Sequence, residues 1–469
     1  MSDPTWVSIL PPLLAIVLAI WTRQVILSLF AGIWMGMTLL AGYNPFSGLA
    51  GSLDGIVRVF SNEGDARVLI FTLLIGSMVA TIEHSGGVRG FVHFLEQRRW
   101  VHTGLRAQLM AWVTGLVIFI ESNITLLVAG SVSRPLFDRF RISREKLAYL
   151  IDATSAPVCV MIPLNAWGAF IIGLVASSGV EKPLETFVAA LPFNFYAIAA
   201  ILLALVVIVW RVDIGPMKAA ETRTREGQLH WPGATPMLEA EIDHGEASDG
   251  PPPSALHMVL PIVTMIAVMP LGLYVTGQGD MMAGSGSRSI LWAVCAAIAV
   301  SWVMLLLRGE SVHTLMQVFM KGAADLLPIS AILLLALALG DVAQALGTGP
   351  FVAGAVGEAV PAPLLAPLVF LVAAFIAFSV GSSWGTFAIM VPIAIPIALS
   401  LDLSVPLFLA AAVSGGIFGD HASPISDTTV VASMASASDH IEHVRTQLPY
   451  ALLAAAIAAL GFLLAGLAG

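Results

Sequence analysis

The stretch Gly419-Asp-His-Ala-Ser-Pro-Ile-Ser-Asp-Thr-Thr429 places two carboxylates, an imidazole and four hydroxyls between two apolar segments. Those apolar segments cover 406–418 and 430–437. A charged side chain near the centre of a bilayer costs on the order of 3 kcal/mol on insertion scales. We therefore expect an ion, a proton or a partner side chain to compensate Asp420 and Asp427 at that depth.

The composition of the whole chain indicates a polytopic all-α membrane protein. Its 469 residues are 58% hydrophobic and only 11% charged, whereas soluble domains carry about 25% charged residues. The sequence has no phosphate-binding loop, ATPase motif or nucleic-acid module. We therefore expect a non-enzymatic protein of the lipid bilayer that has no organic cofactor and no nucleic-acid partner, and that draws its energy from an ion gradient.

Ten apolar stretches are candidate membrane-spanning helices, each of which needs about 20 residues. Two further stretches, 107–133 and 364–400, have polar or glycine-rich residues at their centres, and each is predicted to be a re-entrant hairpin. The polar segment 211–256 is predicted to be a flexible cytoplasmic linker between two halves of the chain. The predicted spans are 7–21, 25–42, 67–84, 147–176, 187–210, 257–276, 290–307, 325–344, 406–438 and 448–468.

The polar motifs of the first half recur in the same order in the second half. Each half has a polar motif at its predicted hairpin tip, ten residues before a proline, and then an aspartate motif that ends in proline. The matching sequences are Glu121-Ser-Asn-Ile-Thr125 before Pro135 with Gly381-Ser-Ser-Trp-Gly-Thr386 before Pro396, and Asp152-Ala-Thr-Ser-Ala-Pro157 with Asp420-His-Ala-Ser-Pro424.

The basic residues support an inverted arrangement of the two halves. Each half has five predicted crossings, an odd number, so 257–469 should be inverted relative to 1–210. With the N-terminus outside a prokaryotic inner membrane, nearly all lysines and arginines fall on the cytoplasmic side, as the positive-inside rule requires. The exceptions are Arg58, Arg67, Lys182 and Arg288.

Inverted repeats with interrupted helices are typical of secondary transporters that bind their cargo near the membrane midplane. Segments 147–176 and 406–438 are predicted to be broken helices, because each is longer than one crossing and contains a proline among polar residues. Hard cations prefer oxygen ligands, so sodium is expected at the carboxylates and hydroxyls. The predicted ion- or proton-binding residues are Glu121, Asp152, Asp420 and Asp427; the ion- or substrate-binding residues are Ser122, Asn123, Thr125, Ser155, Ser382, Ser383, Thr386, Ser423 and Thr428, with His421 and Trp384 beside them.

Structural roles for the same residues stay open from the sequence. Serine and threonine in membrane helices commonly hydrogen-bond to their own backbone or to a neighbouring helix. His421 is also compatible with a simple hydrogen bond. His440 and His443 are spaced three apart, which suggests metal ligands, but the segment 438–447 is predicted to be cytoplasmic, which favours solvated polar residues.

Two long motifs resemble the NhaC-type sodium/proton antiporter family of the ion transporter superfamily. They are Gly419–Thr429 and Ser133–Val158. The resemblance implies inverted repeats with paired hairpins, electrochemical exchange of sodium against protons, and a homodimer. Some relatives move amino acids or carboxylates instead. The tip Ser122-Asn-Ile-Thr125 also resembles the Ser-Asn-Thr sodium motif of divalent anion/sodium symporters, with one residue inserted.

One departure from the family leaves the cargo open. Many NhaC-type proteins have Phe-Asp-Asp-Tyr at the first hairpin tip, where this chain has Phe119-Ile-Glu-Ser-Asn123. The loss of one carboxylate weakens two-proton exchange and leaves groups that suit an organic solute. We therefore expect either a sodium/proton antiporter or a sodium-coupled symporter or exchanger of a small amino acid or carboxylate.

Overall fold

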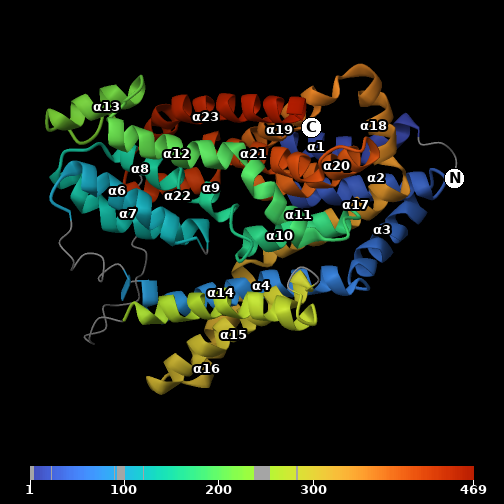
Figure 1. The fold of residues 1–469 in the computed structure, drawn as a ribbon, viewed down its shortest axis with the longest axis horizontal. Coiled ribbons are helices and arrows are strands. Elements are labelled where there is room, and N and C mark those ends of the chain that lie inside the picture. Colours follow the sequence, from blue (N-terminus) through green and yellow to red (C-terminus); the bar gives the residue numbers. More distant parts are fainter. Residues whose placement is uncertain are drawn as a thin grey trace.

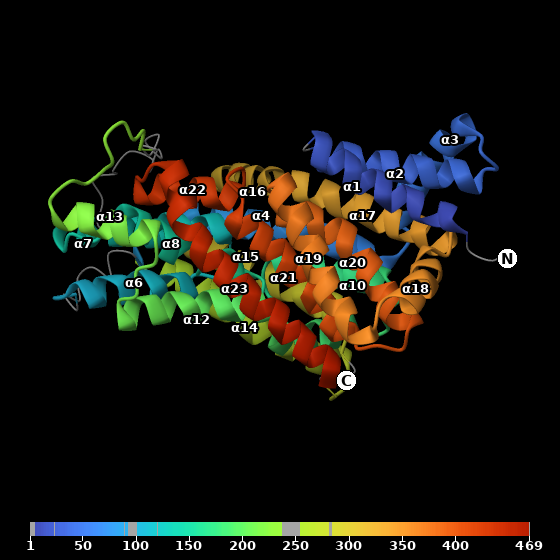
Figure 2. The ribbon, with the colours of Figure 1, turned by 90° about the horizontal axis from the view of Figure 1, so that it is seen from above.

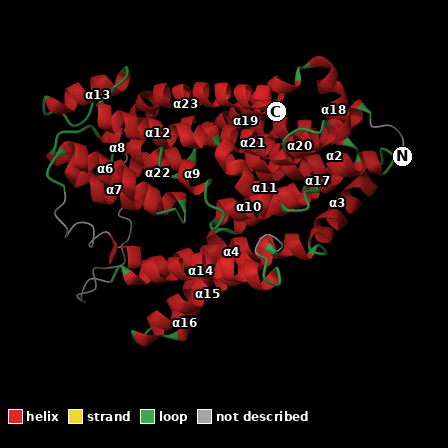
Figure 3. Ribbon diagram, viewed as in Figure 1, coloured by secondary structure: helices red, strands yellow, loops and turns green. Residues whose placement is uncertain are grey.

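The computed structural model is helical almost throughout the part of the chain that it describes (Figure 3). Eight of the described helices are long and apolar enough to cross a membrane, and two bent helix pairs raise this number to ten. The prediction of an all-α polytopic membrane protein is therefore confirmed. The described residues are 5–22, 24–88, 90–91, 101–119, 121–236, 254–280 and 284–468, without the side chains of 353 and 356–359.

The first half starts with two antiparallel apolar helices, α1 and α2. The next helix, α3, bends away from α2 by 119°. The side chain of Asn44 caps α3, and Asn62 caps the long helix α4 in the same way, so the chain can turn sharply without leaving these helix ends unsatisfied. The bounds are η1 Trp6–Ile9, α1 Leu10–Thr22, α2 Val25–Leu40, α3 Pro45–Val59 and α4 Glu63–His84.

A hairpin and a broken helix follow in the first half. The hairpin is formed by α6 Gly104–Val117 and α7 Ser122–Arg139. The broken helix has three parts, α8 Arg144–Asp152, α9 Ala156–Cys159 and α10 Ala166–Ser177. The half closes with α11 Pro183–Ala190, η2 Leu191–Phe193 and α12 Phe195–Trp210.

The second half repeats this order of elements. It has a helix pair followed by a shorter helix (α14, α15, α16), a long helix (α17) and a connecting helix (α18). A hairpin (α19 and α20), a broken helix (α21 and α22) and a long final helix (α23) then complete it. The bounds are α14 Leu256–Thr276, α15 Gly286–Leu307, α16 Val312–Asp325, α17 Leu327–Ala345, α18 Thr348–Ala359, α19 Ala362–Val380, α20 Ser383–Ser400, α21 Val405–Ala422, α22 Asp427–Ser436 and α23 His440–Ala468.

Two helix hairpins and two helix breaks therefore lie where the motifs of the sequence predicted them, whereas the re-entrant placement of the hairpins in the membrane stays a prediction, because α19 and α20 are each long and apolar enough to cross it. The division into repeats at 1–210 and 257–469 stays a prediction, because 237–253 lies outside the described residues.

The two halves interlock instead of lying side by side. The hairpin helix α7 packs against α22 of the other half, and α20 packs against α10. Likewise α2 contacts α17, and α4 contacts α15 and α16. Figures 1 and 2 show α23 running along the molecule from the α13 end toward the other end. Each broken helix is thus surrounded by elements of both halves.

Small residues allow these close approaches. A Cβ added to Gly130 of α7 would lie 2.6 Å from the Cβ and 2.8 Å from the carbonyl oxygen of Ala435 in α22. Between helices in lipid the hydrophobic effect contributes little, so close packing of small residues stabilises their contact. Gly130 therefore sets the distance between the first hairpin and the second broken helix.

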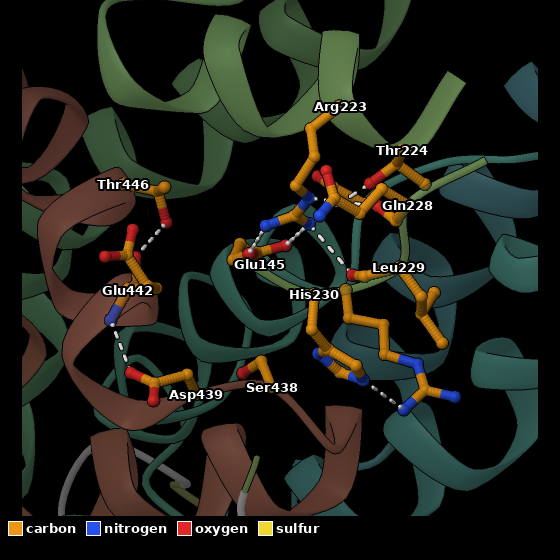
Figure 4. A network of polar contacts seen from close by, with 12 residues as sticks. Glu145, Arg223, Thr224, Gln228, Leu229, His230, Ser438, Asp439, Glu442 and Thr446 are labelled. Carbon is orange, nitrogen blue, oxygen red and sulfur yellow. Dashed lines mark hydrogen bonds and ion pairs between the residues drawn. The ribbon is translucent and has the colours of Figure 1, made fainter. Parts of the chain in front are cut away.

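The linker prediction is wrong in one part, because α13 Pro216–Arg225 is helical and packed onto α8. Arg223 is buried and donates to both oxygens of Glu145, at 2.8 and 3.0 Å (Figure 4). Glu221 accepts from the backbone N–H and the hydroxyl of Ser143, at 2.8 and 2.7 Å. These charge-assisted hydrogen bonds hold the segment against the core.

We expect the substitution Gly130→Ala to lower the free energy of unfolding by about 1–3 kcal/mol, because its methyl group overpacks the contact with Ala435. The matched control is Gly55→Ala in α3, where an added Cβ meets nothing within 4 Å. That control should be neutral or stabilise by up to about 1 kcal/mol, since alanine favours helix. Thermal unfolding in detergent measures both, and equal melting temperatures would contradict the packing role of Gly130.

Candidate ion site at the helix breaks

The first hairpin tip gathers four of the predicted residues around the start of α7. Glu121 is the N-cap residue, and one carboxylate oxygen accepts from the backbone N–H of Ile124 at 2.9 Å. Its other oxygen accepts from the side chains of Ser122 and Asn123, at 3.2 and 3.3 Å. Thr125 donates to the carbonyls of Ile118 and Glu121 and closes the turn. Glu121 therefore accepts from an N–H group at the start of α7 that has no partner within the helix. The N-terminus of a helix also favours a negative charge.

Asn165 joins this tip to the first helix break. Its amide donates to the carbonyls of Phe119 in the tip and Cys159 in α9, at 2.8 Å each. The side-chain oxygen of Asn165 accepts from Gly168 and caps α10. Asn165 was not among the predicted site residues, although an asparagine directly before an apolar run is a helix-start signal.

The second hairpin tip turns at Gly381, whose φ of +71° is in the left-handed region. A Cβ there would lie 2.7 Å from the Ile425 side chain, so only glycine lets this tip approach the second helix break. Ser382 caps α20 by accepting from Gly385, and Thr386 donates back to the Ser382 carbonyl at 2.9 Å. Ser423 from the break donates to the Phe378 carbonyl at 2.8 Å. Tip and break are therefore one packed unit.

Asp420 lies inside this unit, and its side chain is fully buried. Ser383 from the hairpin tip donates to one carboxylate oxygen at 2.9 Å, and Ser426 from the break donates to the other at 2.5 Å. Ser426 also lies 3.0 Å from the hydroxyl of Thr428. Within the described part of the chain, no ion pair joins Asp420 to a lysine or arginine. Hydroxyls from two separate elements thus converge on one buried carboxylate.

Asp427 differs from Asp420 in being exposed. It begins α22, where the first turn favours an acidic side chain. Its charge interacts with those of Glu121 at the first tip and Asp420 at the second break. Asp427 is therefore near enough to the acidic groups of the first tip and the second break for their charges to interact.

Asp152 of the first break takes its partners from α23. Gln447 donates to a carboxylate oxygen of Asp152 at 2.8 Å and also donates to the His421 carbonyl. His443 Nε2 lies 3.4 Å from the same oxygen. The hydroxyl of Tyr196 lies 2.7 Å from His421 Nδ1. These contacts tie the first break to the end of α21, while Ser155 only donates to the Asp152 carbonyl at 3.1 Å.

The prediction that 438–447 is solvated is wrong for His443 and Gln447, which are buried. The α23 helix packs against α8 and thereby removes these side chains from water. His440 binds the break, because its ring nitrogens lie 3.0 Å from the Ser433 hydroxyl and 2.7 Å from the Pro424 carbonyl. Among the residues described, no group of three or more His, Cys, Asp or Glu side chains is arranged to hold a metal ion.

Trp384 links the second hairpin tip to α10. Its ring centroid lies 4.6 Å from that of Trp167 and 5.0 Å from that of Phe170. Trp167 in turn contacts Phe387 edge-on. This aromatic cluster holds α20 and α10 together, one from each half of the chain.

The structure thus brings together Asp420, Ser383 and the 423–428 turn as one group, and Glu121, Ser122, Asn123 and Thr125 as another. The repeat symmetry suggested that Asp152 would hydrogen-bond to the first hairpin tip, as Asp420 does to the second. In the structure its carboxylate instead bonds to Gln447 of α23. Ser426, Tyr196, His443 and Gln447 were not predicted as site residues. Ser426 had a usable sequence signal, because it lies within the 419–429 motif, and His443 had one in its spacing from His440, although that spacing suggested a metal site instead of a contact with Asp152.

The profile of the Na+/H+ antiporter family matches residues 158–467, which include the second hairpin and both parts of the second broken helix. The chain belongs to this family. The resemblance of its motifs to sodium/proton antiporters is thereby confirmed, and so is its place among transporters of the membrane. An uncharacterized protein of Haemophilus influenzae is 33% identical to this antiporter-family chain over 490 aligned positions, covering 99% of the chain and 91% of that relative.

Two solved transporters share the fold of this antiporter-family protein. The Alcanivorax borkumensis YdaH transporter has a TM-score of 0.57 at 15% identity, with 89% of this chain and 88% of that chain covered. Neisseria gonorrhoeae MtrF, presented as one of a class of antimetabolite efflux pumps, has a TM-score of 0.58 at 13% identity, with 89% and 84% covered. At such identities the likeness shows a common fold and nothing about the cargo.

Asp439, just before α23, gives a testable pH dependence. Burial alone would raise the pKa of Asp439, but hydrogen bonds from the N–H groups of Glu442 and Thr235 and from the Thr235 hydroxyl outweigh burial and lower it. A lowered pKa stabilises the fold above the carboxylate's ordinary value, and this contribution is lost as the pH falls through the folded-state pKa. We expect Asp439→Ala to lower the free energy of unfolding by about 0.5–2 kcal/mol at neutral pH, as the loss of other helix caps does.

The difference in the free energy of unfolding between Asp439→Ala and the unchanged protein should shrink as the pH falls below about 4, the ordinary pKa of an aspartate. Thermal unfolding in detergent across that range measures it. Asp54→Ala, at an exposed position of α3, is the control and should show no such trend. A pH-independent difference for Asp439→Ala would refute the charge-dependent cap.

Proposed function

We propose that the protein is a sodium/proton antiporter in which Asp420 binds sodium and protons in turn. The observation that carries the proposal is the fully buried Asp420 carboxylate with a serine hydroxyl on each oxygen, Ser383 from a hairpin tip and Ser426 from a helix break. Family membership supports sodium as a transported ion. The two ligands exclude each other, because burial favours the protonated carboxylate and a bound cation favours the ionised one.

The hydroxyl groups suit either occupant. The Ser383 and Ser426 hydroxyls donate to the carboxylate of Asp420, and this arrangement suits an ionised carboxylate without a bound cation. Rotation of each hydroxyl about its C–O bond would turn a lone pair toward a sodium ion instead, which adds oxygen ligands to the carboxylate. The site would thus lose and regain the cation without rearrangement of the backbone.

Alternating access is part of this proposal. The exposed Asp427 would receive ions from solvent and pass them to Asp420, with Glu121 completing the acidic path. The hairpins and broken helices of both halves would move together against the remaining helices, since they form one packed unit. In this scheme Asp152 and His421 position the end of α21 through Gln447 and Tyr196.

One observation favours the second candidate, a sodium-coupled symporter or exchanger of a small amino acid or carboxylate. The side-chain oxygen of Asn123 at the first tip is buried without a hydrogen-bond partner, and it would accept from a solute amine. The efflux function stated for MtrF, a protein of the same fold, is compatible with an organic solute. In this candidate the aromatic cluster of Trp384 would border the solute, and Asp420 would retain sodium.

The membrane arrangement proposed with this function is a multi-pass protein of the prokaryotic inner membrane with its N-terminus outside. The ion pair between Arg288 and Glu63 supports it, because it places Arg288 at the same end of the molecule as Arg67, the Glu63 partner. Both arginines are predicted to be outside. A homodimer is proposed from the family resemblance alone.

In proteoliposomes that contain a pH-sensitive dye, an outward sodium gradient should change the lumenal pH. Asp420→Asn should abolish that change. Ser383→Ala should lower the affinity for sodium by roughly 10–100-fold, because it removes a hydrogen-bonding oxygen beside a charged group. Ser379→Ala is the matched control, because its hydroxyl donates only to its own helix. A pH change that survives in Asp420→Asn would end the antiporter proposal. Uptake of a labelled amino acid or carboxylate that requires sodium, without a pH change, would establish the second candidate.

A further inference from the structure

A cavity of about 730 Å³ lies at the α13 end of the molecule, away from the ion site. It opens between the start of α6, the turn from α7 to α8, the segment after α12, and α13. Figure 1 shows α13 beyond the ends of α12 and α8, at one extremity of the helix bundle. The cavity therefore lies where the membrane-spanning helices end. Its basic lining residues are Arg141, Lys146, Arg211, Lys218 and Arg225.

Two of these cations are already neutralised. Lys146 donates to Asp213 at 2.6 Å and lies 3.9 Å from Glu221. Arg225 lies 3.6 Å from Glu221. The two acidic lining residues, Asp213 and Glu221, are thus already paired with Lys146 and Arg225.

The remaining cations have no such partner. Arg141, Arg211 and Lys218 are exposed, and none of them forms an ion pair within the described part of the chain. Arg141 has a single long hydrogen bond, 3.5 Å to the Arg225 carbonyl. Three uncompensated positive charges around one cavity favour an anion, and arginine suits phosphate oxygens in particular.

Gln108 adds a second kind of contact. It lines the cavity, it is nearly buried, and its side-chain oxygen has no hydrogen-bond partner. Its amide group is already used, because it donates to the Gly104 carbonyl at 3.2 Å. The free oxygen is an acceptor and requires a donor such as a ligand hydroxyl group.

The exposed apolar side chains beside the cavity favour a lipid over a free phosphate as its ligand. Val113 and Val117 of α6 and Leu202 and Val209 of α12 are exposed, and Trp112 of α6 donates to the Ile201 carbonyl of α12, so these two helices lie together. Trp210, 71% exposed, follows directly before Arg211. An apolar, lipid-facing surface that ends in a tryptophan beside an arginine is characteristic of the membrane interface.

We propose that this cavity binds the headgroup of an anionic phospholipid with a free hydroxyl, such as phosphatidylglycerol. Arg141, Arg211 and Lys218 bind the phosphate, Gln108 accepts from the headgroup hydroxyl, and the acyl chains lie along α6 and α12. The bound lipid stabilises the contact of α13 with α8, because Lys218 is one turn from Glu221, which holds Ser143 at the start of α8. The α8 helix ends at Asp152 of the first break, so the lipid would regulate transport through α8.

The test uses the full chain in detergent and short-chain dioctanoyl lipids, with bound mass detected by native mass spectrometry. Dioctanoyl phosphatidylglycerol should bind, and dioctanoyl phosphatidylcholine and free glycerol phosphate should bind at least tenfold more weakly. The triple variant Arg141→Gln, Arg211→Gln, Lys218→Gln should bind roughly 100-fold more weakly, since each basic residue near an anionic surface contributes about fivefold. The matched control carries Arg58→Gln, Lys182→Gln and Arg288→Gln and should bind unchanged.

Gln108→Leu separates the hydroxyl contact from the charge. It should remove the preference for phosphatidylglycerol over phosphatidate and leave the binding of phosphatidate intact. Equal binding of glycerol phosphate would make this a free-anion site, and equal binding of phosphatidylcholine would remove the role of charge. Unchanged binding by the cavity triple variant would show that the lipid binds elsewhere. Each of these three results overturns the proposal, and none depends on which ion the protein transports.

Discussion

The carboxylate of Asp420 imposes the main constraint on this structure. A buried charge in a membrane protein needs compensation, and here each oxygen of Asp420 receives one serine hydroxyl. One serine belongs to a hairpin tip and the other to a helix break. The two irregular segments must therefore lie against each other, and both interrupt the regular helices at the same place.

Interrupted helices leave backbone groups that lipid cannot satisfy, so the rest of the fold covers them. Thr125, Ser423, Asn165 and Gln447 all donate to carbonyls freed at the tips or breaks. The interlocking of the halves has the same cause. Each break has walls on several sides, and helices of both halves supply them, since α22 contacts α7 and α8 while α10 contacts α17 and α20.

The polar segment after α12 shows how a region without apolar periodicity can still be ordered. Arg223, Glu145 and Glu221 are buried together with Ser143, and each is satisfied by charge-assisted hydrogen bonds. This network fixes α13 on α8, the half-helix that ends at Asp152. A surface element outside the predicted spans is thereby joined to the centre of the protein.

The sequence by itself determined the fold class, the two hairpins, the two breaks and most of the residues around Asp420. It could do so because hydropathy, prolines and helix-capping residues act locally, within one or two turns of the chain. Only the tertiary structure decided that Asp152 faces His443 and Gln447, that Tyr196 contacts His421, and that Asp427 is exposed while Asp420 is buried. These facts depend on how helices hundreds of residues apart pack, because α23 buries side chains whose local sequence resembles a solvated loop.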